Sequence, residues 1–106
     1  MMMIDLDSKI GTELGFTSDF FKSSWLYLDE EKNVMWISCI ISIYPGKGDF
    51  RRLVKRLINR GYNIIIPTPL GRMVDIGIKQ GWKIKSIKTE HGDVECFVLE
   101  NKFKGV

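Results

Sequence analysis

The sequence predicts one α/β (α+β) domain built on a mixed, mostly antiparallel sheet with a central parallel strand–helix–strand unit. Strand-like runs alternate with two segments of helical spacing. A chain of 106 residues is long enough for one domain and too short for two. Apolar residues make up 44% and charged residues 27%, as in a globular chain with a core.

Residues 1–24 are mixed in character. The stretch "DLDSKIGTELGF" predicts a short helix after Asp5 or Asp7, and Ser18 suits the N-cap of a turn through Phe20 and Phe21. The first residues lack the basic and apolar regions of a signal peptide. We therefore expect a cytoplasmic protein.

Residues 25–44 predict a β-hairpin, because two strand-like runs flank the polar cluster Asp29 to Asn33. The second run, Val34 to Tyr44, is almost wholly apolar. Such a run is typical of a central strand covered on both faces. It is also the longest apolar run in the chain and too short to span a membrane, so we expect no membrane partner.

A glycine loop follows, and "DFRRLVKRLINRGY" then has helical spacing. The apolar positions form one stripe: Phe50, Leu53, Val54, Leu57 and Ile58. The basic residues occupy the rest of the helix surface: Arg51, Arg52, Lys55, Arg56 and Arg60. Asp49 suits the N-cap and Gly61 the C′ position.

The remaining chain completes the sheet. "YNIIIP" predicts a short buried strand, and Thr68 with Pro69 predicts the N-cap and first residue of a second helix that ends at Gly81. The alternating tail around "EHGD" predicts a terminal hairpin. The central strand–helix–strand unit is expected to be parallel, and the two hairpins antiparallel.

The glycine loop is a candidate anion site, because it joins a buried strand to a helix N-terminus. Gly46 and Gly48 would let a phosphate approach the backbone, and Lys47, Arg51 and Arg52 would add positive charge. Its spacing is neither GxxxxGK[ST] nor GxGxxG. The alternative is a tight turn before an ordinary solvated helix.

"PGKGDFRRL" resembles the pyrophosphate-binding segment of the GNAT (Gcn5-related) N-acetyltransferase superfamily. "TPLGRMVDIGIKQGW" is similar to a later helix of that family, with Gly81 and Trp82 in place of its Gly-Phe pair. The resemblance implies one small, divergent GNAT-like domain with the acyl-CoA N-acyltransferase-like fold. Its core would be residues 25–106, and residues 1–24 would be an abbreviated acceptor-side segment. Small acetyltransferase-like proteins of phages and mobile elements are similarly compact.

The resemblance implies acetyl-CoA, or CoA, as the cofactor. In the family, backbone N–H groups near the splayed end of the central strand bind the thioester carbonyl. The implied cofactor-binding residues are Ile41, Ser42, Ile43, Pro45, Gly46, Lys47, Gly48, Asp49, Phe50, Arg51 and Arg52.

Several positions depart from the family pattern. Pro45 stands in place of Gln or Arg, and Phe50 in place of a small residue. Leu70 replaces the usual Asn, and Gly77 stands where a tyrosine often protonates the leaving thiolate. With these departures, the resemblance supports the fold better than the activity.

Acetyl transfer needs a proton donor and a general base. Tyr44 at the edge of the loop is the candidate donor, and Glu95 on the last strand is the candidate base. His91 suits an exposed hairpin tip. Cys39 and Cys96 are expected to be buried free thiols, and the spacing of His and Cys predicts no metal site.

The leading hypothesis is acetyl transfer from acetyl-CoA to an unidentified amine, on either a small molecule or a protein. The first alternative is a catalytically inactive GNAT-like module that binds CoA or a protein partner. The second is a basic-helix module for nucleic acid, which the net charge of +3 and the lack of interleaved aromatic residues disfavour. A homodimer is compatible with the short acceptor side.

Overall fold

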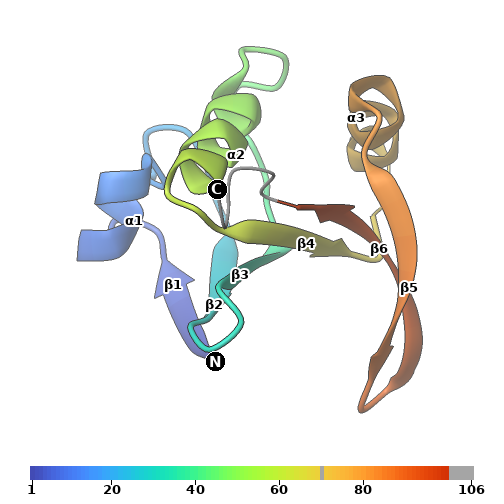
Figure 1. Ribbon diagram of the computed structural model, residues 1–106. Coiled ribbons are helices and arrows are strands. Elements are labelled where there is room, and N and C mark those ends of the chain that lie inside the picture. Colours follow the sequence, from blue (N-terminus) through green and yellow to red (C-terminus); the bar gives the residue numbers. More distant parts are fainter. Residues whose placement is uncertain (70, 101–106) are drawn as a thin grey trace.

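The computed structural model describes residues 1–69 and 71–100, and over these the chain forms a six-stranded mixed sheet with three helices (Figure 1). The strands are β1 (Met2–Asp5), β2 (Trp25–Asp29), β3 (Val34–Cys39), β4 (Asn63–Pro67), β5 (Lys83–Thr89) and β6 (Gly92–Leu99). The helices are α1 (Lys9–Leu14), α2 (Asp49–Asn59) and α3 (Arg72–Gln80). The strand order is β1-β2-β3-β4-β6-β5. The predicted mixed, mostly antiparallel sheet is confirmed, with β3 and β4 as its parallel pair.

The N-terminal segment contributes more to the sheet than the sequence predicted. Met2–Asp5 forms the edge strand β1, which pairs antiparallel with β2. The short helix after Asp7 is confirmed as α1, and the Ser8 hydroxyl caps it by accepting from the Gly11 N–H at 3.0 Å. The predicted N-cap at Ser18 is wrong, because the Phe20 and Phe21 N–H groups both donate to the Thr17 carbonyl.

The predicted hairpin is confirmed as β2 and β3, but the expected strand Val34 to Tyr44 is too long. β3 ends at Cys39, after which Ser42 makes an isolated bridge with Phe21. The chain leaves the sheet here because its backbone groups pair with the segment that precedes β2.

The parallel pairing of β3 with β4 is short. It begins at Val34 and Asn63 and ends at Trp36 and Ile65. Beyond this point β3 pairs only with β2. β4 remains paired with β6, where Ile66 lies opposite Phe97. The two parallel strands therefore diverge toward their carboxyl ends, just before the glycine loop.

One hydrophobic core lies between the helices and one face of the sheet. The buried residues that share it include Leu14 of α1, Leu53 and Leu57 of α2, Met35 of β3 and Phe97 of β6. Met73 and Ile76 of α3 pack against the same core. Figure 1 shows the three helices on this side of the sheet. In the described part of the chain, helices cover one face of β3, and the expected cover of its second face is not seen there.

The later elements agree with the sequence except at the start of α3. Gly61 follows α2 with φ of 91°, and Gly81 ends α3 with φ of 72°, as expected of C-terminal glycines. The helix begins at Arg72 and not at Pro69. Thr68 has φ of 45°, and its N–H donates to the Glu95 carbonyl at 2.8 Å, so it continues the pairing of β4 with β6.

The helices of the described part of the chain are too short or too polar to cross a membrane.

Candidate anion-binding site

The loop between β3 and α2 carries two glycines in the left-handed region. Gly46 and Gly48 each have φ of 83°, a conformation that glycine adopts without steric cost. The Lys47 N–H donates to the Tyr44 carbonyl at 3.4 Å, which closes the turn. Gly48 is the N-cap of α2, and no side chain of the described residues caps the helix there. The expectation that Asp49 is the N-cap is wrong, because the left-handed turn places it one residue inside the helix.

Asp49 is buried at the start of α2 and forms an ion pair with Arg52, three residues further along the helix. The same guanidinium donates to the Lys47 carbonyl at 3.3 Å. Arg52 thus links the helix to the loop and keeps the turn closed. Because Asp49 balances its charge, Arg52 adds less to an anion site than the sequence suggested.

Three other basic side chains surround the loop. Lys47 and Arg51 are exposed, and among the described residues neither forms a salt bridge. Arg72, the first residue of α3, reaches across to the loop, with its Nη2 3.9 Å from where a Cβ on Gly46 would lie. Arg72 was not among the site residues predicted from the sequence. Its position directly after Gly71, at a helix start, was the available signal.

The backbone N–H groups after β3 are only partly free. The Ile41 N–H donates to the Ser24 hydroxyl at 2.8 Å, and the Ile43 N–H donates to the Phe20 carbonyl at 2.8 Å. In the part of the chain that the structure describes, the Ser42 N–H donates to no protein acceptor. Of the three residues predicted to bind a carbonyl, Ser42 is the one with an available donor.

Phe50 lies in the core and not on the surface of the loop. Its ring meets Trp82 edge to face, with centroids 6.2 Å apart, and Trp82 meets Phe97 in the same way at 5.8 Å. These three rings connect α2 to β6 and to Trp82, which follows the Gly81 C-cap of α3. The Phe50 ring is therefore used for packing in the core.

Gly77 is buried where α3 crosses β6, with the ring of Phe97 directly against it. No side chain fits at this position without movement of the ring. Glycine at position 77 therefore has a structural cause, which is the close approach of the helix to Phe97.

The two candidate catalytic residues lie on different elements. Tyr44 is 59% exposed in the loop before the glycines. Glu95 is exposed on β6. It lies two residues before Phe97, so both side chains face the helix side of the sheet. The structure shows no hydrogen bond between the Tyr44 and Glu95 side chains.

His91 lies at the exposed tip of the β5–β6 hairpin, as expected, and its backbone N–H donates to the Thr89 hydroxyl at 3.2 Å. The cysteines are both free, but only Cys96 is fully buried. Burial raises the pKa of the Cys96 thiol, and the Thr68 backbone N–H partly opposes that rise. Cys39 is half-exposed, because β3 ends there. The described residues contain no group of three or more His, Cys, Asp or Glu side chains placed to hold a metal ion.

The basic face of α2 is partly occupied. Arg56 donates to the Leu14 carbonyl at 3.4 Å, and Arg60 pairs with Glu13 at 3.7 Å. Both side chains therefore hold α1 against α2. Arg51 and Lys55 remain as exposed cations on this face, which makes a short surface for a nucleic-acid backbone.

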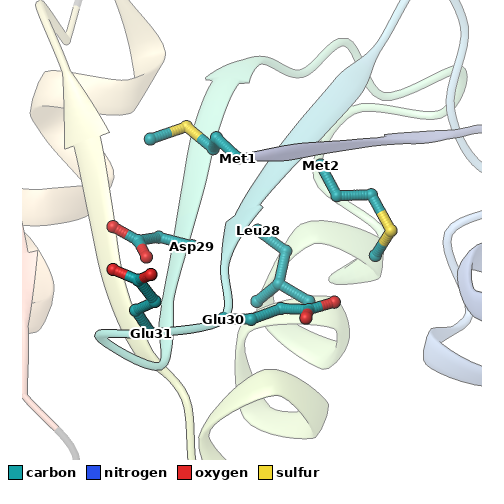
Figure 2. Close-up of a pocket in the computed structure, with 6 residues that line it drawn as sticks. All are labelled: Met1, Met2, Leu28, Asp29, Glu30 and Glu31. Atoms are coloured by element: carbon teal, nitrogen blue, oxygen red, sulfur yellow. The ribbon is translucent and has the colours of Figure 1, made fainter.

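A hollow of about 500 Å³ lies at the other end of β3. Figure 2 shows its lining of Met1, Met2, Leu28, Asp29, Glu30 and Glu31. Three of these side chains are acidic. The hollow is therefore unsuited to an anionic cofactor, and it is separated from the glycine loop by the length of the strand.

No protein-family model matches the chain, and the comparisons with curated proteins and with solved structures gave no significant match.

Proposed function

We propose that this domain binds the phosphates of acetyl-CoA at residues 45–52 and transfers the acetyl group to an amine, as GNAT enzymes do. One observation carries the proposal: two left-handed glycines lead into an uncapped helix N-terminus, at the point where β3 diverges from β4. Backbone N–H groups and a helix dipole favour an anion there. Lys47 and Arg72 add charge from two sides of the loop.

The divergence of the two parallel strands supports the path proposed for the rest of the cofactor. The pantetheine chain would run from the loop toward the end of β3. The Ser42 N–H, which donates to no acceptor among the described residues, would then donate to the thioester oxygen and stabilise the charge that develops on it.

The proposed transfer forms one bond and breaks one. The amine nitrogen attacks the thioester carbonyl carbon, and collapse of the tetrahedral intermediate breaks the C–S bond. Glu95, directly or through water, accepts the proton that the nitrogen loses. Tyr44 supplies the proton that the leaving thiolate takes up, because Gly77 leaves no room for a helix tyrosine.

Isothermal titration calorimetry tests the binding step. We expect micromolar affinity for acetyl-CoA and CoA, and much weaker binding of pantetheine, which lacks the nucleotide phosphates. Gly48→Arg should abolish binding, because arginine is strained at φ of 83° and its side chain would occupy the loop. No binding by the folded wild-type chain would show that the loop is only a turn.

A second candidate function, a GNAT-like module that binds CoA without catalysis, is favoured by the packing of Gly77 against Phe97. Release of free CoA from acetyl-CoA in the presence of a panel of amines separates the two. Amine-dependent release that Tyr44→Phe slows supports the enzyme. Tight binding with no release above the uncatalysed rate supports the module.

A further inference from the structure

The face of the sheet that the helices do not cover carries a continuous row of large side chains. Strand pairing places one residue of each strand opposite a residue of the next strand. Paired residues point to the same face of the sheet. The row runs in strand order through Met3, Tyr27, Trp36, Ile65, Val98 and Lys83. We call this surface the open face.

The open face is apolar at its centre and remains partly accessible. Tyr27, Trp36, Ile65 and Val98 are all half-buried. Met3 is 51% exposed, and Trp25, which shares the face through its pairing with Asp5, is 37% exposed. A contiguous apolar surface of this kind on a small domain is typical of an interaction site.

Opposite charges lie at the two ends of the open face. At the β1 edge, Asp5 is on this face, and Asp29 of β2 is on it at the opposite end of the strands. At the other edge are Lys83 and Lys85 of β5, with Glu100 paired to Lys85 at 2.9 Å. Asp5 and Lys85 lie at opposite edges of one sheet, and so they do not neutralise each other within one chain.

This charge pattern is self-complementary. A twofold axis that runs parallel to the strands, midway between two stacked sheets, reverses the strand order from one sheet to the other. β1 of one copy then lies over β5 of its partner, with Asp5 close to the partner's lysines. In the centre, the Trp36 ring covers the equivalent of Ile65, and Tyr27 covers the equivalent of Val98. Sheets packed in this way keep their strands within about 30° of each other.

We propose that the open face binds a second copy of this chain, and that the two sheets form a symmetric sandwich. The apolar centre supplies the binding free energy, and the charged ends set the orientation. This proposal is independent of whether the glycine loop binds CoA.

Analytical ultracentrifugation of the full chain over a range of concentrations tests the proposal, with charge variants at the two ends. Asp5→Lys and Lys85→Asp should each weaken the dimer about tenfold, because each places like charges opposite one another twice in the assembly. The double variant Asp5→Lys/Lys85→Asp restores opposite charges in both places and should recover most of the lost affinity. Recovery is specific to pairing between copies, since the two residues do not meet within one chain.

Lys88→Asp is the matched control, because it changes the same charge on the same strand on the helix side of the sheet. It should leave the dimer constant unchanged. Circular dichroism of each variant checks that the fold is kept. A wild-type chain that stays monomeric at the highest soluble concentration would overturn the proposal. So would a dimer that neither single change weakens, or one that the double variant does not restore.

Discussion

A Cβ on Gly77 would come within 2.3 Å of the Phe97 ring, so α3 and β6 meet at this point without room for a side chain. The contact fixes how closely α3 approaches the sheet. It also brings the Trp82 ring against Phe97 and, through it, Phe50 of α2. The position of Arg72 at the glycine loop depends on this packing, because Arg72 begins the same helix.

Gly77→Ala should destabilise the fold by about 1–2 kcal/mol. Overpacking of a core costs roughly 1–3 kcal/mol, and the better helix propensity of alanine returns up to about 1 kcal/mol. Urea unfolding followed by circular dichroism measures the change. Phe97→Leu on the Gly77→Ala background should recover part of the loss through the freed space. If the losses in unfolding free energy from Gly77→Ala and Phe97→Leu simply add in the double variant, the contact with Phe97 is not the cause.

Asp49→Asn should lower stability by about 1 kcal/mol, because Arg52 loses its ionic partner and the first turn of α2 loses a favourable charge. Asp75→Asn is the matched control, since Asp75 is an exposed acid in the first turn of α3. Thermal unfolding compares the two. Equal effects would mean that the Asp49–Arg52 pair does not hold the loop.

Lys47→Ala and Arg72→Ala should each weaken CoA binding about tenfold, since a charge-assisted hydrogen bond to phosphate contributes roughly 1.5–3 kcal/mol. Binding of pantetheine should not change. Lys88→Ala removes an equal charge far from the loop and controls for the overall field. If raising the salt concentration weakens CoA binding equally in all three variants, the two residues do not contact the phosphates.

Hydrogen bonds from the Ser18 hydroxyl and backbone N–H hold the pKa of Asp7 below its ordinary value of 3.8. The ionised form is therefore favoured in the folded state. The stability that this contributes is present above pH 3.8 and is lost as the pH falls through the folded pKa. Ser18→Ala should move the pKa of Asp7 upward in an NMR titration, and Ser38→Ala should not. An unchanged pKa in Ser18→Ala would refute the role of the hydroxyl.

Local signals in the sequence predicted most of the fold. Apolar spacing located α2, and alternation around "EHGD" located the terminal hairpin. β1 was missed because "MMID" has no alternation or turn signal, and it becomes a strand only by pairing with β2. The end of β3 was also missed. The Ile41 N–H donates to the Ser24 hydroxyl, and these two residues are distant in sequence.

The candidate site was predictable in part. The glycine loop and its helix are local, and the sequence located both. The burial of Asp49 with Arg52 depends on the left-handed turn at Gly48, one residue from the expected cap. The approach of Arg72 and the exclusion of a side chain at Gly77 depend on how α3 packs, which spacing alone does not specify.

The most direct test of the central claim is an amide NMR titration of the chain with CoA. We predict large shift changes at the backbone N–H groups of Lys47, Gly48 and Asp49, with smaller ones at Ser42 near the end of β3. Adenosine 3′,5′-bisphosphate should reproduce changes in the loop but not at Ser42, because it lacks pantetheine. Shifts spread over the exposed arginines and lysines, with none concentrated in the loop, would contradict the account.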